Sequence, residues 1–275
     1  MKKTITSVLN QTYPSFELII VDDGSTDDTS VVVQSFSDQR IQYIKKSNEE
    51  RGAARNAGIK AAAGDYVTFL DSDDLFYPNH LETAFLELSK VNHELFHIRY
   101  EILDTGGKTI KQMEFLDDSA NKKLIEGNFM SCQGVFVRRD IAGKNLFNTQ
   151  RELSGLEDWE LWLRLAVKYK IKFHNSITSA IINHEQRSVL NADKEMLIEK
   201  TTLFMKLVLS NSEIVNYYSS QLSKFKSSCY SYIALHIALT KKDRSAAVRF
   251  LIKSFSDSPT VIFKRRFYAT LKHLF

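Results

Sequence analysis

The chain has 275 residues, a net charge of +4 at pH 7 and 43% hydrophobic residues. This length fits one large domain or one catalytic domain with a smaller appendage, and the composition excludes a disordered or fibrous protein. Cys132 and Cys229 are far apart, which argues against a disulfide framework and favours a reducing cytoplasm. No apolar run reaches the roughly 18 residues of a membrane span, and residues 1–11 lack the apolar core of a signal peptide.

The charge is unevenly distributed along the chain. Residues 224–275 carry 11 Lys or Arg and 2 Asp or Glu, so the remainder is mildly acidic. A basic region beside an acidic body favours contact with an anionic partner such as a membrane surface. A solvated helical face without a partner explains the same charges equally well.

The first part of the chain alternates between helical and strand patterns. Apolar residues at helical spacing predict a helix over residues 2–12, and the continuous apolar run 16–21 predicts a buried strand. Residues 25–36 are expected to form a second helix, because hydroxyl and carboxylate side chains at its start can cap free N–H groups. Residues 41–45 predict the next strand.

The alternation then continues. The alanine-rich run 51–63 predicts a helix, with Gly64 as its C-cap. Residues 66–70 predict a third strand, and Pro78 is expected to open a helix to about residue 91. Further strands are expected at 95–103 and 132–138.

The pattern changes in the second half. Residues 157–168 (EDWELWLRLAVK) predict an amphipathic helix with an acidic start. Strand patterns stop after residue 191, and helices are expected at 193–209, 213–239 and 243–255. The sequence therefore predicts an α/β domain over residues 1–190 and a helical, basic region over residues 191–275.

Two acidic clusters follow predicted strands. Strands that alternate with helices predict a right-handed, mostly parallel sheet, and such sheets bind ligands at the carboxyl ends of their strands. Asp22-Asp23 and 71–74 (DSDD) each lie at such an end, so we expect them to meet in one crevice. Asp71 and Asp73 on a tight turn offer oxygen ligands to Mg²⁺ or Mn²⁺. A solvated acidic turn is the alternative, but the matching cluster weighs against it.

Three motifs, in this order and spacing, resemble the inverting family 2 glycosyltransferases: LIIVDDGSTDDT, RGAARNAGIKAAAGDYVTFLDSDD and LEDWELWLRL. The resemblance covers about residues 1–185. It implies a GT-A fold, which is Rossmann-like with a mostly parallel sheet, and sugar transfer from a nucleotide-sugar, commonly a UDP-sugar, to an acceptor hydroxyl. It also implies a Mn²⁺ or Mg²⁺ cofactor, a saccharide or lipid-linked acceptor and a role in cell-surface polysaccharide synthesis at the cytoplasmic face. No nucleic-acid partner is expected.

The resemblance assigns the donor side of the site. Asp22 matches the position that hydrogen-bonds the nucleobase, and Asp23 lies beside it. Arg55 matches an arginine whose guanidinium suits phosphate or base contact. Asp71 corresponds to the acid that meets the ribose.

The resemblance also assigns metal and catalytic residues. Asp73 corresponds to the principal metal ligand, and His184 to a histidine that approaches the metal or the diphosphate; a structural histidine is the equal alternative. Asp158 matches the catalytic base, which takes the proton of the acceptor hydroxyl. At a helix start Asp158 is expected to stay ionised at neutral pH. Without the other motifs, plain helix-start charge would be the better interpretation of Glu157-Asp158.

Two further features bear on function. His93-Glu94-x-x-His97 matches the zinc protease pattern, but we expect a strand there, which separates the two histidines, so no zinc site is predicted. Family members begin with a strand that precedes the helix at residues 2–12, and this central strand is expected to be missing here. Its neighbours would then keep unpaired N–H and C=O groups. Either the true start lies upstream, or the fragment is impaired, or the sheet closes over the gap. The alternative function is therefore a truncated, catalytically impaired pseudoenzyme that binds a nucleotide.

Overall fold

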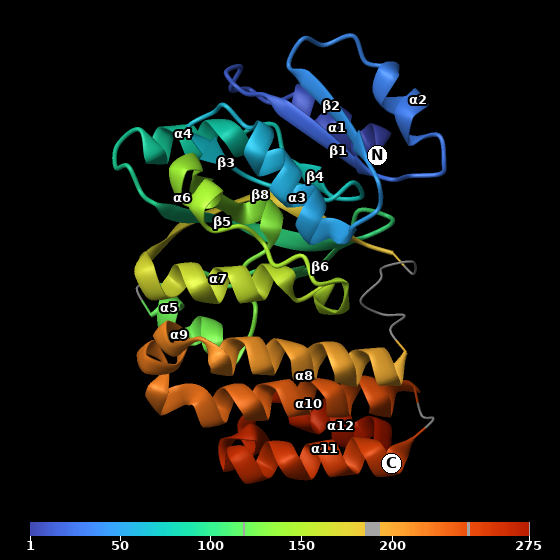
Figure 1. Cartoon of the computed structure of the whole chain (residues 1–275), viewed down its shortest axis with the longest axis vertical. Coiled ribbons are helices and arrows are strands. Elements are labelled where there is room, and N and C mark those ends of the chain that lie inside the picture. The colour runs from blue at the N-terminus through green and yellow to red at the C-terminus, as the bar shows by residue number, and fades with distance from the viewer. Residues whose placement is uncertain (118, 185–192, 241–242, 275) are drawn as a thin grey trace.

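The computed structural model describes residues 1–117, 119–184, 193–240 and 243–274. The strands and shorter helices of the first part form the upper half of Figure 1, and long helices are stacked below them. The predicted α/β class with a helical C-terminal part is confirmed. The predicted boundary near residue 190 lies outside the described residues, so the division into two domains stays a prediction.

The described strands form two sheets. β1 (Leu18–Asp23) pairs in parallel with β2 (Ile41–Lys46) in a two-stranded sheet. The second sheet has six described strands. Five of them follow the order β3 (Tyr66–Val67), β7 (Val135–Arg138), β5 (Leu95–Asp104), β8 (Ile171–Asn183) and β4 (Leu75–Phe76). The sixth, β6 (Thr109–Gln112), pairs with β5 outside this order. No strand among the described residues joins β1 to β3.

The pairing is more mixed than the sequence predicts. β1–β2 and β5–β8 are parallel, whereas β3–β7, β4–β8, β5–β6 and β5–β7 are antiparallel. β8 was not predicted, although it lies between β5 and β4. It carries Asn183 and leads directly to His184, so this strand positions part of the site.

Helices surround both sheets. In the first part they are α1 (Lys2–Leu9), α2 (Thr29–Gln34), α3 (Glu50–Ala61), α4 (His80–Leu88), α5 (Ala120–Lys123), α6 (Arg139–Lys144) and α7 (Glu157–Lys168). The prediction that Gly64 caps α3 is wrong, because the helix already ends at Ala61 and its C-cap residue, Ala62, is extended. The Gly64 N–H instead donates to Oε1 of Glu17 at 2.7 Å.

The second part is helical, as predicted. It contains α8 (Lys194–Ser210), α9 (Ser212–Tyr217), α10 (Leu222–Thr240), α11 (Arg244–Asp257) and α12 (Arg265–Leu274). The single helix expected at 213–239 is broken, because Tyr218 is buried and its hydroxyl donates to the Asn121 carbonyl at 2.6 Å. None of the helices in these described stretches is both long and apolar enough to cross a membrane.

The largest core joins the two parts. The indole ring of Trp159 on α7 lies 4.7 Å from the ring of Phe204 on α8, which lies 5.6 Å from Phe225 on α10. The indole N–H of Trp159 also donates to the Leu124 carbonyl at 2.9 Å. Burial of these aromatic rings against one another stabilises the position of α7. The start of α7, which carries Glu157 and Asp158, is therefore fixed from the helical side.

α1 fixes the acidic turn from the other side. The Thr4 hydroxyl donates to the Ser72 carbonyl at 2.7 Å, and the Gln11 amide donates to the Tyr77 carbonyl at 2.7 Å. These bonds satisfy backbone oxygens on both sides of β4, which itself has only two residues. The turn between β3 and β4 is thus held at a defined position despite its short strands.

Candidate active site

The acidic turn lies between β3 and β4 and brings three carboxylates together. One carboxylate oxygen each of Asp71, Asp73 and Asp74 lies within 4.8 Å of the others. Asp74 is buried, and its Oδ1 accepts a hydrogen bond from the Ile182 N–H at 3.0 Å, which ties the turn to β8. Asp73 is exposed, and its Oδ2 lies 2.8 Å from Nε2 of His184. The predicted metal residues Asp73 and His184 are therefore neighbours.

The donor set of this turn fits a hard divalent cation. Mg²⁺ and Mn²⁺ prefer carboxylate oxygen, and they commonly bind through one or two carboxylates together with substrate phosphates. Three carboxylates in a small volume repel one another, and a bound cation relieves that repulsion. The residues that could hold the ion are Asp71, Asp73 and Asp74, with the His184 imidazole beside Asp73.

Arg55 on α3 connects the acidic turn to the start of α7. Its Nη2 donates to Oδ1 of Asp71 at 2.8 Å, and its Nη1 donates to Oε1 of Glu157 at 2.8 Å. The side chains of Arg55 and Glu157 are only 11% and 3% exposed. The sequence predicted phosphate or base contact for Arg55, whereas both of its Nη atoms bind carboxylates in the structure. The sequence assigned Glu157 no role of its own, because its partner Arg55 lies 102 positions away, too far for any local pattern to show.

Asp158 lies next to this ion pair, at the first turn of α7. Its Oδ1 accepts the Trp159 N–H at 2.7 Å, and its Oδ2 accepts the Asn128 side-chain amide at 3.0 Å. Burial, followed by the negative charge of Glu157, raises the pKa of Asp158 to about 7. The expectation that Asp158 is fully ionised at neutral pH is therefore wrong, since burial outweighs the helix start. A base with a pKa near the operating pH is well suited to proton transfer.

Asp22 and Asp23 end β1 and have separate partners. Asp22 is buried, and it accepts hydrogen bonds from the Tyr43 hydroxyl and from the Ser25 N–H at 2.7 Å. Burial alone would raise the pKa of Asp22, but these bonds outweigh it and lower the pKa. Asp23 accepts from Nζ of Lys46 at 2.7 Å and from the Glu49 N–H at 3.0 Å.

The predicted site residues fall into two groups. Asp71, Asp73 and His184 share contacts around the acidic turn, and Arg55 links this turn to the Glu157-Asp158 helix start. Asp22 and Asp23 contact β2 and the residues just before α3 instead. Their meeting with the other acids in one crevice stays a prediction.

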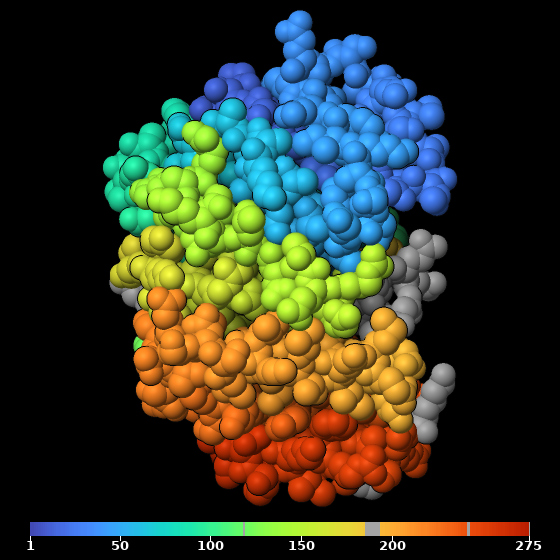
Figure 2. Space-filling model, in the orientation of Figure 1, coloured from blue at the N-terminus to red at the C-terminus, as the bar shows by residue number. Residues whose placement is uncertain are grey.

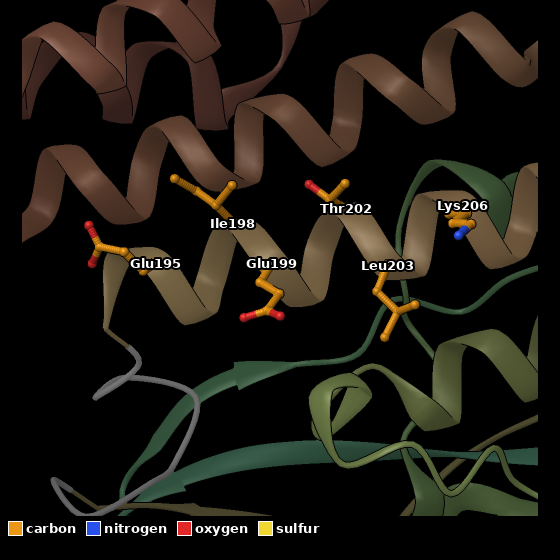
Figure 3. A pocket seen from close by; sticks show the side chains of 6 residues that line it. All are labelled: Glu195, Ile198, Glu199, Thr202, Leu203 and Lys206. Carbon is orange, nitrogen blue, oxygen red and sulfur yellow. The ribbon is translucent and has the colours of Figure 1, made fainter.

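A separate hollow of about 530 Å³ runs along α8 (Figure 3). Its described lining consists of Glu195, Ile198, Glu199, Thr202, Leu203 and Lys206. In Figure 3, Ile198 and Thr202 point toward α10, whereas Glu199 and Leu203 point away from it. The described lining comes from α8 alone and includes none of the predicted site residues.

Comparison with models of protein families identifies the family of this chain. The model of the family named "Glycosyl transferase family 2" matches residues 1–145. The chain belongs to glycosyltransferase family 2. The resemblance found in the sequence motifs is thereby confirmed.

Solved structures agree on the GT-A fold. The crystal structure of S. aureus TarS residues 1–349 aligns with 99% of this chain and 83% of that chain, with a TM-score of 0.69 and 19% identity. The same fragment in complex with UDP-GlcNAc aligns with 96% of this chain and 86% of that chain, with a TM-score of 0.64 and 17% identity. The alignment covers the helical C-terminal part of this family 2 member as well as its sheets.

Curated relatives match part of the chain. An uncharacterized glycosyltransferase of Rickettsia bellii is 36% identical over 167 residues, which are 60% of this chain and 24% of that protein. The UDP-Glc:alpha-D-GlcNAc-diphosphoundecaprenol beta-1,3-glucosyltransferase WfgD of Escherichia coli is 32% identical over 166 residues, which are 59% of this chain and 62% of WfgD. The matched part spans only about a quarter of the length of this Rickettsia bellii protein and of its relatives from Rickettsia felis and Rickettsia conorii.

Proposed function

We propose that this family 2 member is an inverting glycosyltransferase that moves a sugar from a UDP-sugar to an acceptor hydroxyl. The observation that carries the proposal is the position of Arg55, which binds Asp71 on the acidic turn and Glu157 at the start of α7. The Arg55 guanidinium thus lies between two groups. One is the carboxylate cluster of the acidic turn, which suits a metal and a diphosphate, and the other is the start of α7, where the Asp158 carboxyl suits proton transfer. An inverting transfer needs these two functions on opposite sides of the anomeric carbon.

On the donor side, the acidic turn would hold the cation and the diphosphate. Asp71, Asp73 and Asp74 would bind Mg²⁺ or Mn²⁺, with His184 orienting Asp73 or joining it as a ligand. When bound, the ion neutralises charge that develops on the leaving diphosphate. Asp22 and Asp23 would contact the nucleoside. The TarS fragment has been crystallised with UDP and with UDP-GlcNAc, which supports a UDP-linked donor.

On the acceptor side, Asp158 would act as the base. The acceptor oxygen attacks the anomeric carbon while the bond from that carbon to the diphosphate oxygen breaks, and the hydroxyl proton moves to the Asp158 carboxylate. The Asn128 amide and the Trp159 N–H, which bind opposite oxygens of Asp158, would hold the carboxyl group in one orientation. The Glu157 charge raises its proton affinity, which strengthens it as a base.

We also propose a lipid-linked saccharide acceptor, used in cell-surface polysaccharide synthesis at the cytoplasmic face of a membrane. The name of WfgD, a diphosphoundecaprenol glucosyltransferase, supports this acceptor class. The basic region 224–275 supports peripheral contact with an anionic membrane.

The direct test measures UDP release from a panel of UDP-sugars with Mn²⁺ and a GlcNAc-diphospho-lipid acceptor. The expected result is acceptor-dependent UDP release that Asp73→Ala and Asp158→Asn abolish, while Asp140→Asn, an exposed aspartate paired with Arg138, leaves it unchanged. Full activity of Asp73→Ala would contradict the proposal. Binding of UDP by the unmodified protein without transfer to any acceptor would favour a nucleotide-binding pseudoenzyme instead.

A further inference from the structure

α11 presents an exposed face with an apolar side and a basic side. Val248, Ile252 and Phe255 are 39%, 62% and 45% exposed, and their i, i+4, i+7 spacing places them in one stripe along the helix. Arg249 and Lys253 are also exposed, and each follows a residue of the stripe by one position. The exposed face of α11 therefore combines large apolar side chains with a parallel row of cations.

The opposite face of α11 is already occupied. It is buried in the core between α10, α11 and α12, through Ala246, Ala247, Leu251 and Ser254. α11 lies at the end of the molecule farthest from α2 and β2, as the lowest layer of Figures 1 and 2. The apolar stripe on its outer side is thus not explained by packing within the described chain.

α11 and α12 both carry exposed cations. Arg244 is exposed at the start of α11, and α12 has a second exposed row made of Arg265, Tyr268 and Lys272. The acids of 243–274 are Asp243 and Asp257, and Asp243 forms an ion pair with Nζ of Lys194 at 3.0 Å. Lys and Arg therefore outnumber Asp and Glu by seven to two over residues 243–274.

We infer that the exposed face of α11 docks on an anionic membrane surface, with Val248, Ile252 and Phe255 in the headgroup region and the flanking cations on lipid phosphates. A helix with an apolar side and a Lys- and Arg-rich side is the usual interfacial element, and each cation adds attraction to anionic lipids. This inference deepens the proposed function, on which it rests for its biological purpose, by naming the surface that meets the membrane.

Charge complementarity decides between a membrane and a second copy of the chain. In a symmetric dimer through this face, the same patch would meet itself, so Arg249 and Lys253 of one copy would approach the cations of the other. Such juxtaposition of like charges is unfavourable. An anionic surface satisfies the apolar stripe and the cations together.

The test is sedimentation of the full chain with vesicles of phosphatidylcholine that contain about 30% phosphatidylglycerol, and with phosphatidylcholine vesicles alone. We expect binding to the anionic vesicles only, with loss of binding as salt is raised to about 0.5 M. Arg244→Gln combined with Arg249→Gln should weaken binding by about tenfold, and Ile252→Ser by several-fold.

Matched variants elsewhere separate this face from general charge or hydrophobicity. Ile110→Ser on β6, where Ile110 is 54% exposed, and Lys90→Gln combined with Lys111→Gln should leave vesicle binding unchanged. Thermal unfolding checks that each variant is folded. Failure to bind anionic vesicles, or binding that both α11 variants retain, would overturn the inference. So would a dimer in sedimentation velocity that Ile252→Ser dissociates. The vesicle assay contains no donor or acceptor, so a failure to bind vesicles does not count against the proposed sugar transfer. In the same way, a failure of sugar transfer does not change the interpretation of vesicle binding.

Discussion

Arg55 and Glu157 are separated by 102 positions in the sequence, yet the Arg55 Nη1 lies 2.8 Å from the Glu157 Oε1 in a mostly buried ion pair. The same guanidinium binds Asp71 on the acidic turn. Because a buried charge without a partner is very unfavourable, each of these groups depends on the others for its position. The pair therefore couples the geometry of the acidic turn to that of α7.

Replacement of Arg55 by Leu should destabilise the protein by about 3–5 kcal/mol, since it leaves Glu157 buried and unpaired. Urea unfolding measures this loss. The double variant Arg55→Leu with Glu157→Leu should recover much of the stability, because the uncompensated charge is gone. Arg138→Ala, which breaks the more exposed pair with Asp140, should cost no more than about 1 kcal/mol. If Arg55→Leu lost no more stability than Arg138→Ala, the buried Arg55–Glu157 pair would not stabilise the fold as proposed.

Asp158→Asn should lower kcat by about 10²- to 10⁴-fold, because the base is lost while its shape is kept. The free energy of unfolding at pH 8 should nevertheless increase by about 1–2 kcal/mol. Folding raises the pKa of this carboxyl from 3.8 to about 7. The protonated carboxyl therefore contributes its full stabilisation of the folded state below pH 3.8, and this contribution is lost as pH rises through 7. Thermal unfolding at pH 8 compares the two proteins, and lower stability of the variant would contradict the assigned pKa shift.

The pH dependence of transfer follows from the same group. A base must be ionised to accept a proton, so kcat/KM should rise with pH to a plateau above about 7. Glu157→Gln removes the nearby negative charge and should move this rise to lower pH. Initial rates between about pH 5.5 and 9 give the profile. A profile that Glu157→Gln leaves in place would show that Glu157 does not set the proton affinity of Asp158.

The sequence predicted those parts of the site that rest on local patterns. An apolar strand followed by acids places Asp71 and Asp73 on one turn, because a strand, its end and its turn occupy consecutive residues. The same pattern places Asp22 at the end of β1, whereas its place in the site stays a prediction. The Arg55–Glu157 pair has no such signal, since it forms only when α3 and α7 pack in the folded chain. The pKa of Asp158 was predicted in the wrong direction for the same reason, as burial and the Glu157 charge come from tertiary structure.

The fold shows the same division between local and long-range effects. The strand expected at 95–103 is confirmed by β5, whereas β8 was missed although it pairs with β5 along most of its length. The polar run His174-Asn175-Ser176 interrupts the apolar pattern of β8, and the register with β5 shifts between Ile98 and Tyr100. β5 pairs with β8 on both sides of this irregular run, Ile98 with His174 and Arg99 with Ile177. A strand that is interrupted in this way cannot be predicted from the periodicity of its apolar residues.

Two buried histidines should make the protein sensitive to acid. His80 and His97 are fully buried, and burial lowers the pKa of each to about 3 from 6.5, with the His80 value lowered further by His97. Because the unfolded state binds these protons more readily, stability should be complete above pH 6.5 and fall as pH drops toward 3. Urea unfolding of Asp158→Asn, in which that carboxyl no longer titrates, should show a loss of more than about 1 kcal/mol between pH 7 and pH 5. His80→Gln, which cannot take up a proton, should be less stable at pH 7 but should lose less between these two pH values.

Removal of the predicted metal ligands should be visible in ion binding itself, without any measurement of transfer. Titration calorimetry with Mn²⁺ should show that Asp73→Asn weakens binding by at least about 100-fold, because a ligand oxygen is replaced by a neutral amide. His184→Ala should weaken it by about 10- to 100-fold, whether the imidazole binds the ion or only orients Asp73 at 2.8 Å. Asp140→Asn should leave the affinity unchanged. Equal Mn²⁺ affinity of Asp73→Asn and the unmodified protein would show that the acidic turn is not the metal site, and the proposed division of labour between the turn and Asp158 would then lose its donor side.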